Sequence, residues 1–510
     1  MDITFITNRL KKIPTVIRVA IIVSLISGFI CHMMGMTEFF LIHDTIYQHE
    51  ALKDTVSSGR FLLGVFGSLS SDLHIPWING LIILIFIALT SAAVVSLFDI
   101  KDKFTAGLIS ALMTVTPTIG YFIIYSFAGD AYAFALFCSV FALLLTKRYK
   151  FGFIPGIILF CVSLAIYQAF IMFAISACVL IVFCDAISNN INFKYYGRLI
   201  ITGGGGVLLY LIVNYLILNV LNTDIASYQN IDSLVSIPRL ISLFNFSGSI
   251  AQMYSILVTE KYLIGFGNIG IIALVSILTL CFITISIIYK NFNNLNKSIV
   301  DKKTRSHFLI NTLIAVISIL ALTIALNIMS PLGQGYYHKM MQQQYILIPV
   351  GFVIIINNYK DYISHVIIKR IAAVAAILLV FTLTVRVNVG YTKFHDMSVN
   401  VHTQYCKVAD AIEHTEGFRD GMDTRVLSYG YAYYNGEYFR PGINTNAIKE
   451  YLRLYEGIHI NIIKNEKDFD SEEFIKEHFS EVGVCDTVVI DDILYVYIDQ
   501  TGVNTVYIYY

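Results

Sequence analysis

The chain has 510 residues, of which 56% are hydrophobic and 14% charged, and its formal net charge at pH 7 is zero. A water-soluble globule of this length needs more polar groups to cover its surface, so the composition excludes a soluble enzyme. It predicts an α-helical protein that crosses a lipid bilayer many times.

Apolar runs long enough to cross a bilayer recur along the first part of the chain. A membrane-spanning helix needs about 20 apolar residues, and we expect eleven spans. They cover Ile17–Gly35, Trp77–Phe98, Thr105–Phe127, Ala131–Thr146, Phe151–Ile166, Ala169–Ile187, Leu199–Leu221, Leu263–Tyr289, His307–Met329, Tyr345–Asn357 and Ile371–Val389. Two long apolar stretches are divided into separate spans, at Gly129-Asp130 and at Tyr167-Gln168. The first span is expected to remain as an anchor, because no signal-peptide cleavage site follows it.

The positive charges support these divisions, because Lys and Arg collect in the short cytoplasmic loops of membrane proteins. With eleven spans, basic residues concentrate in every second loop, such as Lys290–Arg305, and are sparse in the others, such as Asn222–Tyr262. Merging either divided stretch would invert all later loops. The N-terminus is therefore predicted to be cytoplasmic and the segment after the last span to be exported.

A second domain is expected after Gly390, where the composition becomes charged and rich in tyrosine. The expected domains are a transmembrane module over residues 1–390 and a smaller domain over residues 391–510. Helical spacing and β-branched alternation in the tail predict a small α/β fold. The expected helices and strands are Cys406–Glu413, Ser471–Phe479, Thr424–Tyr429, Thr487–Ile490 and Ile493–Ile498. The sequence leaves open whether Cys406 and Cys485 form a disulfide.

Ionisable and hydrogen-bonding residues gather in the loops that are predicted to face outward. They are Glu38, His43, Asp44, Arg60, Asp130, Tyr167, Gln168, Arg239, His338 and Lys339. Charged groups at membrane depth usually face a cavity or a partner. A carboxylate there can take the proton of an attacking hydroxyl, while Arg or Lys holds a departing phosphate. The pattern indicates transfer of a group from a polyprenyl phosphate to a hydroxyl.

The charged residues of this set also have simpler structural interpretations. Asp44 and Asp130 could cap the helices that follow them. Arg60 could extend to lipid headgroups, a common place for arginine at a helix end. His43 could be a hydrogen-bonding residue of its loop.

The later outer loops have similar alternatives. Tyr167 and Gln168 could satisfy backbone groups at a tight turn. Arg239 lies in Leu234–Phe246, a stretch that suits a helix lying in the membrane interface or packed against the tail.

Several motifs together resemble a known family. Phe40–Tyr47 (FLIHDTIY), followed by Ser58–Leu62 (SGRFL) and Ile75-Pro76-Trp77, is similar to the opening of the phage- and island-encoded O-antigen glucosyltransferases of the serotype-converting type. The resemblance covers residues 1–389 in layout. Later landmarks of that family also have counterparts, namely Thr116-Pro117, Ala128–Asp130 and Leu164–Ala169 (LAIYQA).

The resemblance implies an activity and a place in the cell. Members of that family are multi-span glycosyltransferases of the GT-C kind that use undecaprenyl phosphate glucose. They modify O-antigen, the polysaccharide of lipopolysaccharide, at the periplasmic face of the bacterial inner membrane. Many members have two adjacent acids in the first loop, where this chain has His43-Asp44. The role of catalytic base therefore passes to Asp44, with Glu38 as the substitute.

The expected mechanism is an in-line displacement with inversion at the sugar carbon. Asp44 deprotonates the acceptor hydroxyl, and Arg60, with Lys339 or Arg239, binds the donor phosphate. Substrate-orienting roles are expected for His43, Asp130, Tyr167, Gln168 and His338. No cofactor is expected, since no residue spacing indicates a metal site, although Glu38 and Asp44 could together hold a divalent ion. The expected partners are the lipid-linked sugar donor, the O-antigen acceptor and the bilayer, and no nucleic acid.

Two other functions share these features. A transporter or flippase for a lipid-linked sugar would also have a cavity lined by Asp, Arg and Tyr-Gln. Its polar residues would lie at mid-membrane, whereas here they cluster at one face, and no paired repeat of broken helices is evident. Another polyprenyl-dependent transferase of cell-surface polysaccharide would differ only in its donor.

Overall fold

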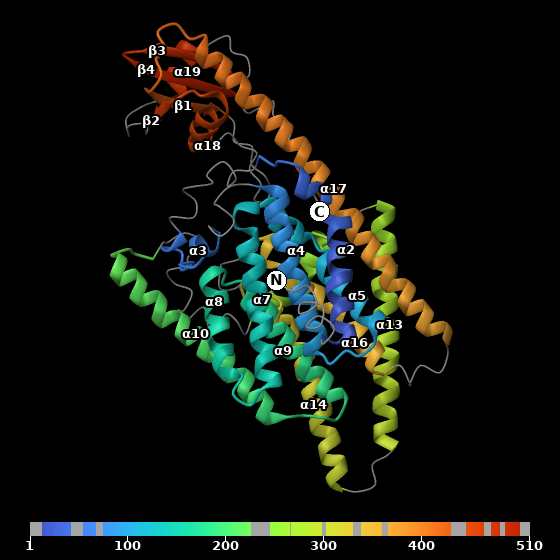
Figure 1. The fold of residues 1–510 in the computed structure, drawn as a ribbon. Helices are drawn as coiled ribbons and strands as arrows, with labels where there is room; N and C mark the ends of the chain where they lie inside the picture. The colour runs from blue at the N-terminus through green and yellow to red at the C-terminus, as the bar shows by residue number, and fades with distance from the viewer. Residues whose placement is uncertain are drawn as a thin grey trace, which may run out of the picture. The chain divides into compact units, whose positions relative to one another are not determined.

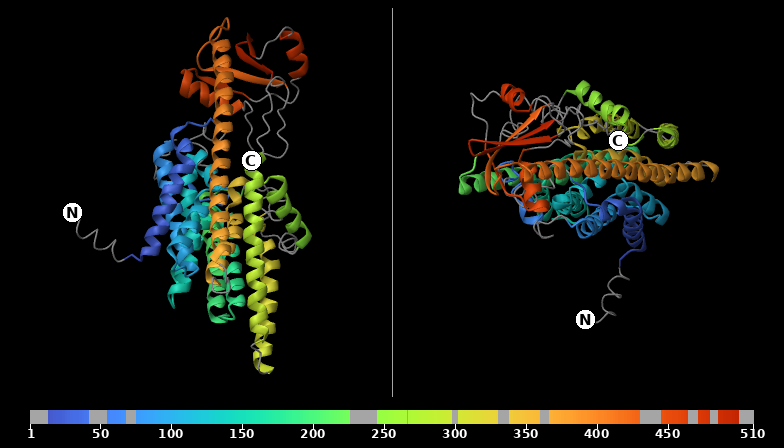
Figure 2. Two further views of the ribbon diagram at one scale, coloured as in Figure 1. Left: turned by 90° about the vertical axis from the view of Figure 1, so that its right-hand side faces the viewer. Right: turned by 90° about the horizontal axis from the view of Figure 1, so that it is seen from above.

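The computed structural model describes residues 13–41, 55–67, 75–225, 245–265, 267–297, 302–329, 338–359, 366–429, 445–463, 471–479 and 485–499. The first part of the chain forms a bundle of mostly antiparallel helices (Figure 1, Figure 2). The helices of the bundle are α2 Thr15–Thr37, α3 Leu63–Gly67, α4 Pro76–Leu97, α5 Lys103–Thr114, α6 Pro117–Ile124, α7 Ser126–Arg148, α8 Phe153–Ile166, α9 Phe170–Ile187, α10 Phe193–Leu221, α12 Phe246–Tyr254, α13 Gly267–Lys297, α14 Lys302–Ala325, α16 Leu347–Asn358 and the first part of α17 Val366–Glu413.

The lengths and compositions of these helices are those of a membrane protein. Among the described residues, eight helices are long and apolar enough to cross a bilayer, and nine if the bent pair α5 and α6 counts as one span. Two further expected spans, Phe151–Ile166 and Tyr345–Asn357, correspond to the shorter apolar helices α8 and α16. The expected total of eleven spans stays a prediction.

One expected span is broken in its middle, because α5 ends at Thr114 and α6 begins at Pro117 with an axis that differs by 51°. Proline has no N–H, so carbonyls of the preceding turn lose their helical partners. Gln343 Nε2 donates to the Met113 carbonyl at 3.0 Å, and His32 Nε2 lies 3.0 Å from the Thr114 carbonyl. Backbone groups inside a bilayer need such replacement partners, and here neighbouring elements supply them.

The expected division at Tyr167-Gln168 is confirmed. Helix α8 ends at Ile166 and α9 begins at Phe170, so the two residues form the turn between them. The Tyr167 backbone is extended, with φ −154° and ψ 108°, which takes it out of the helix.

The stretch expected to divide at Gly129-Asp130 does divide into separate helical segments, but the expected position of the boundary is wrong. Helix α7 begins at Ser126 and contains both residues, so the chain turns earlier, at Tyr125. A Cβ on Gly129 would lie 1.9 Å from the carbonyl oxygen of Phe122. The glycine is needed for a close approach of α7 to α6 and not for a helix boundary.

Two compact units divide the chain. One holds Met1–Thr37 and Leu52–Val389, and the other holds Glu38–Ala51 and Gly390–Tyr509. Helix α17 continues through Gly390 into the second unit. The change of composition at Gly390 is therefore not accompanied by a helix end, because neither proline nor a polar turn interrupts the residues around it.

The second unit contains the expected small α/β fold. Its four strands have the order β2-β1-β4-β3, with β1 parallel to both β2 and β4, and β3 antiparallel to β4. The expected helices and strands are confirmed, whereas β2 and α18 were not expected, since a strand of three residues is too short for a pattern. The elements are β1 Met422–Tyr429, α18 Thr445–Tyr451, β2 Ile460–Ile462, α19 Ser471–His478, β3 Cys485–Ile490 and β4 Ile493–Asp499.

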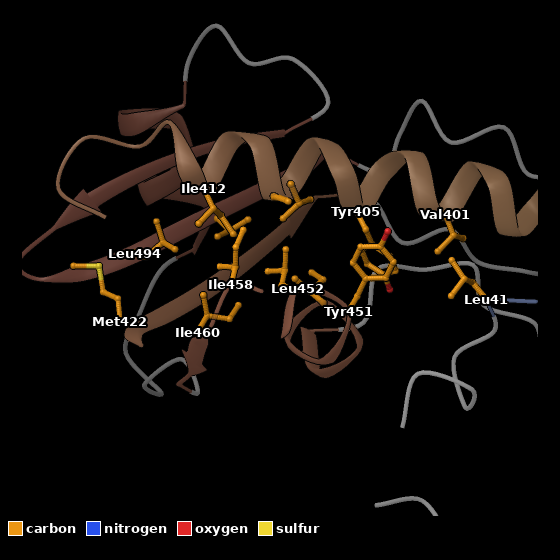
Figure 3. Close-up of a cluster of buried hydrophobic side chains, with 14 residues drawn as sticks. Leu41, Val401, Tyr405, Ile412, Met422, Tyr451, Leu452, Ile458, Ile460 and Leu494 are labelled. Atoms are coloured by element: carbon orange, nitrogen blue, oxygen red, sulfur yellow. The ribbon is translucent and has the colours of Figure 1, made fainter. Parts of the chain in front are cut away.

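The end of α17 provides much of the core of this unit (Figure 3). Tyr405 and Ile412 of the helix are buried in one apolar cluster with Tyr451 of α18 and Leu494 of β4. These helix positions repeat at the spacing of one helical face. The residues of Cys406–Glu413 are thus helical because their apolar face covers the sheet.

The two cysteines of the second unit are both free thiols. Burial raises the pKa of the Cys485 thiol to about 12. Cys485 therefore stays protonated at neutral pH, where a thiol is a weak nucleophile.

Candidate functional site

Most of the predicted site residues lie at one end of the helical bundle, which we call the polar end. It is the end at which α8 terminates and α7, α9 and α16 begin (Figure 1). The polar end carries Arg60, Asp130, Tyr167, Gln168, His338 and Lys339. At the other end of α7, Lys147 and Arg148 form ion pairs with Asp99 at 2.7 and 2.8 Å.

A tight turn positions Arg60. The Gly59 N–H donates to the Val56 carbonyl at 2.9 Å, and Gly59 has a left-handed backbone with φ +74°. Glycine adopts this conformation without steric cost. The Leu62 N–H then donates to the Ala165 carbonyl at 3.0 Å, which fixes the turn to the end of α8.

Two side chains from other helices hold the backbone of this turn. Gln168 Nε2 donates to the Ser58 carbonyl at 3.1 Å and to the Tyr210 hydroxyl at 3.0 Å. The Tyr210 hydroxyl donates to the Gly59 carbonyl at 3.0 Å. The Ser58-Gly59-Arg60 and Tyr167-Gln168 motifs are therefore joined directly. Tyr210, on α10, was missed, because a single tyrosine in a long apolar helix does not stand out.

The Arg60 guanidinium lies over the ring of Tyr167, with 5.2 Å between the guanidinium carbon and the ring centroid. Tyr167 is buried, and its ring contacts those of Tyr132 and Phe170 at 4.9 and 5.3 Å. A cation held over an aromatic face is oriented as well as attracted. The planar fork of N–H groups on arginine matches phosphate geometry, so this arrangement can present an anion-binding group at the polar end.

The hydrogen bonds of Gly59 lead to a testable prediction. In the Gly59→Ala variant the new Cβ would lie 2.5 Å from the Tyr210 hydroxyl oxygen. We expect the turn to shift and transfer activity to fall several-fold, because small misplacements of a positioned group reduce rates strongly. The measurement is a transfer assay on membranes adjusted to equal protein content.

The matched control is Gly421→Ala in the second unit. Gly421 has a similar φ of +82°, but a Cβ there meets no atom within 4 Å. The Gly421→Ala variant therefore has the same kind of backbone strain, about 1–3 kcal/mol, but its Cβ does not clash with a neighbouring side chain. Equal activities of the two variants would contradict a role for the turn in positioning Arg60.

Asp130 is buried in the second turn of α7, with 3% of its surface exposed. Its Oδ1 accepts a hydrogen bond from the Ala131 N–H at 2.8 Å. The helix already begins at Ser126, so Asp130 is not the cap of a helix that starts at Ala131. An acid in this position remains near the first turn of α7, where the helix dipole favours negative charge.

Lys339 is engaged in an ion pair that the sequence did not indicate. Its Nζ lies 2.5 Å from Glu260 Oε2, and Gln342 Nε2 donates to the same oxygen at 3.0 Å. Arg386 of α17 donates to the Glu260 backbone carbonyl at 3.2 Å. An arginine within an apolar helix is a signal of function or pairing, but Glu260 and Gln342 carry no comparable signal in sequence.

His338 connects this ion pair to the rest of the polar end. Its ring contacts Tyr121 and Tyr125 edge-on, with centroid distances of 5.8 and 6.1 Å. Phe122, the residue after Tyr121, contacts Tyr132 at 5.9 Å, and Tyr132 contacts Tyr167. Two sets of ring contacts thus meet at the neighbouring α6 residues Tyr121 and Phe122. One leads to His338, next to Lys339, and the other leads to Tyr167, beneath Arg60.

The remaining predicted residues lie elsewhere. Glu38 belongs to the second unit, where it lies 3.3 Å from the His395 ring nitrogen. His43, Asp44 and Arg239 fall outside the described residues. In the described part of the chain, no group of three His, Cys, Asp or Glu side chains could hold a metal ion.

Comparison with known proteins agrees with the motifs. Residues 33–333, more than half of the chain, match the family described as Glucosyl transferase GtrII. No curated protein and no solved structure matches the chain. Arg60, Tyr167, Gln168 and Tyr210 lie within the matched residues, and Lys339 follows them. The resemblance to the serotype-converting glucosyltransferases is thus confirmed: the chain belongs to the GtrII glucosyl transferase family and is a membrane glycosyltransferase.

Proposed function

We propose that this protein transfers a glucosyl group from a polyprenyl-phosphate donor to a hydroxyl of O-antigen, at the periplasmic face of the bacterial inner membrane. The observation that carries the proposal is the Arg60 turn, which Gln168 and Tyr210 hold at one end of the bundle. A donor with a phosphate and a long apolar tail needs a cation at the edge of the bilayer. In this orientation the N-terminus is cytoplasmic, and the C-terminal domain is periplasmic.

The proposed chemistry is a single displacement. The acceptor hydroxyl oxygen attacks the anomeric carbon of the sugar, and the bond from that carbon to the phosphate oxygen breaks. The electron pair of the broken bond leaves with the phosphate, which Arg60 stabilises as its charge develops. Asp44 takes the hydroxyl proton, with Glu38 as the substitute. One displacement inverts the configuration at the sugar carbon.

The other residues of the polar end have supporting roles in this proposal. Asp130, Tyr167, Gln168, His43 and His338 orient the donor or the acceptor. Further phosphate ligands are Lys339, when Glu260 releases it, and Arg239. The ion pairs of Lys147 and Arg148 with Asp99 lie at the other end of α7 from the polar end. This separation supports chemistry at one face of the membrane.

The test is mass analysis of the surface polysaccharide from cells with and without the gene. We expect a gain of one hexose per repeat unit, and release of that hexose by acid should identify glucose. An unchanged polysaccharide, together with altered distribution of the lipid-linked sugar between the two leaflets, would contradict transfer and indicate a flippase.

A further inference from the structure

Three consecutive glutamines, Gln342 to Gln344, lie in the chain between α14 and α16 and are buried, with at most 2% of the surface of each residue exposed. The side chains of two of them form hydrogen bonds with other segments of the bundle. Gln343 Oε1 accepts from the Thr116 hydroxyl at 2.7 Å, and its Nε2 donates to the Met113 carbonyl. Gln344 Nε2 donates to the Leu326 carbonyl at 2.9 Å.

Gln342 differs from its two neighbours. Its Nε2 donates to Glu260 Oε2 at 3.0 Å, but its Oε1 has no hydrogen-bond partner among the described residues. The orientation of the amide follows from chemistry, because a carboxylate oxygen only accepts and a turned amide would set two acceptors together. A buried carbonyl without a donor is costly and is usually explained by a missing partner.

The cluster around Gln342 has an outer side. The side chains of Glu260 and Lys339 keep 24% and 12% of their surface exposed, whereas Gln342 has none. The ion pair is thus the more exposed part of the cluster, and Gln342 is its buried part. Together these groups provide two acceptors and a cationic donor close to one another.

We propose that Gln342 accepts a hydrogen bond from a hydroxyl of the transferred hexose and determines sugar specificity. This inference rests on the proposed function. Neighbouring sugar hydroxyls donate and accept at once, which matches an amide oxygen beside a carboxylate and an ammonium group. His338, four residues before Gln342 in the chain, contacts the rings of Tyr121 and Tyr125 edge-on, so aromatic side chains of the kind that pack against sugar rings lie close to this segment.

The experiment uses the full-length protein in lipid nanodiscs with an O-antigen acceptor. Its donors are a short-chain polyprenyl-phosphate glucose and the four analogues that each lack one hydroxyl. For the wild type we expect one analogue to lose roughly 10²-fold or more in kcat/KM, because a site built to bind a hydroxyl rejects a substrate without it. In Gln342→Met we expect lower activity with glucose and no further loss with that one analogue.

Gln343→Met is the matched control, since it removes a neighbouring amide whose two ends are satisfied within the protein. It should lower thermal stability and keep the wild-type preference among the analogues. If Gln342→Met is unstable, Gln342→Asn withdraws the oxygen by one methylene group and is judged by the same ratio.

Unchanged analogue ratios in a stable Gln342 variant would overturn the assignment and indicate a buried water at Oε1. Failure of the wild type to transfer any hexose is a different result. It would overturn the proposed function, and this assignment with it.

Discussion

Replacing Asp44 by asparagine is expected to reduce glucosyl transfer by about 10²–10⁴-fold, the usual contribution of a positioned general base. Asparagine keeps the size of the side chain but cannot take the proton of the acceptor hydroxyl. Expression and membrane insertion should be unchanged, because asparagine is a polar side chain of nearly the same size and shape as aspartate. The measurement is the rate of hexose incorporation into O-antigen with purified donor.

Glu38→Gln is the matched control for Asp44. Glu38 lies near His395 in the second unit, and both side chains are about 40% exposed, so loss of this exposed pair should change stability by less than about 1 kcal/mol. If Asp44 is the base, Glu38→Gln retains most activity. Full activity of Asp44→Asn with loss in Glu38→Gln would move the base to Glu38.

Replacing Arg60 by alanine is expected to raise the KM for the lipid-linked donor and to lower kcat/KM by roughly 10- to 100-fold. The reason is the loss of charge-assisted hydrogen bonds to phosphate, each contributing about 1.5–3 kcal/mol. Arg60→Lys should recover only part of this loss, since an ammonium group is a point charge without the bidentate fork. Steady-state kinetics with varied donor concentration distinguish the three proteins.

Arg148→Ala is the control for Arg60. Arg148 lies at the end of α7 that is far from the polar end. It forms an ion pair with Asp99 at 2.8 Å, and its side chain is 47% exposed. Exposed pairs of this kind contribute at most about 1 kcal/mol, so donor affinity should not change. A similar loss in both variants would indicate that Arg60 acts through general stability or lipid contact, which is the simpler interpretation of an arginine at a helix end.

Local sequence predicted the features that depend on neighbouring residues. The turn at Tyr167-Gln168 and the strands of the tail were correct, because polar pairs between apolar runs and β-branched alternation act over a few residues. The position of the turn before α7 was not predicted correctly. Gly129-Asp130 suggested a boundary, but the glycine is required by the carbonyl of Phe122, a contact that depends on how closely α7 approaches α6.

The candidate site was predicted only in part, because its contacts join residues that are distant in the chain. Arg60, Tyr167 and Gln168 could be named from their motifs, but their mutual contacts depend on Tyr210, which comes from α10. The pairing of Lys339 with Glu260 joins residues far apart in the chain. No spacing in a sequence indicates such a pair, because its geometry is set by how the helices pack.

The amino-acid sequence by itself determined that this is a multi-span membrane protein with a small α/β tail and that its polar motifs belong to a glucosyltransferase. Composition and hydrophobic patterning are sufficient for that, since the bilayer admits few alternatives to apolar helices. Only the tertiary structure decided where the span formed by α5 and α6 is broken and which side chains form hydrogen bonds with the carbonyls freed there. It also showed that the amide oxygen of Gln342 has no hydrogen-bond partner among the described residues. Those outcomes depend on hydrogen bonds between distant segments, whose partners are chosen by packing.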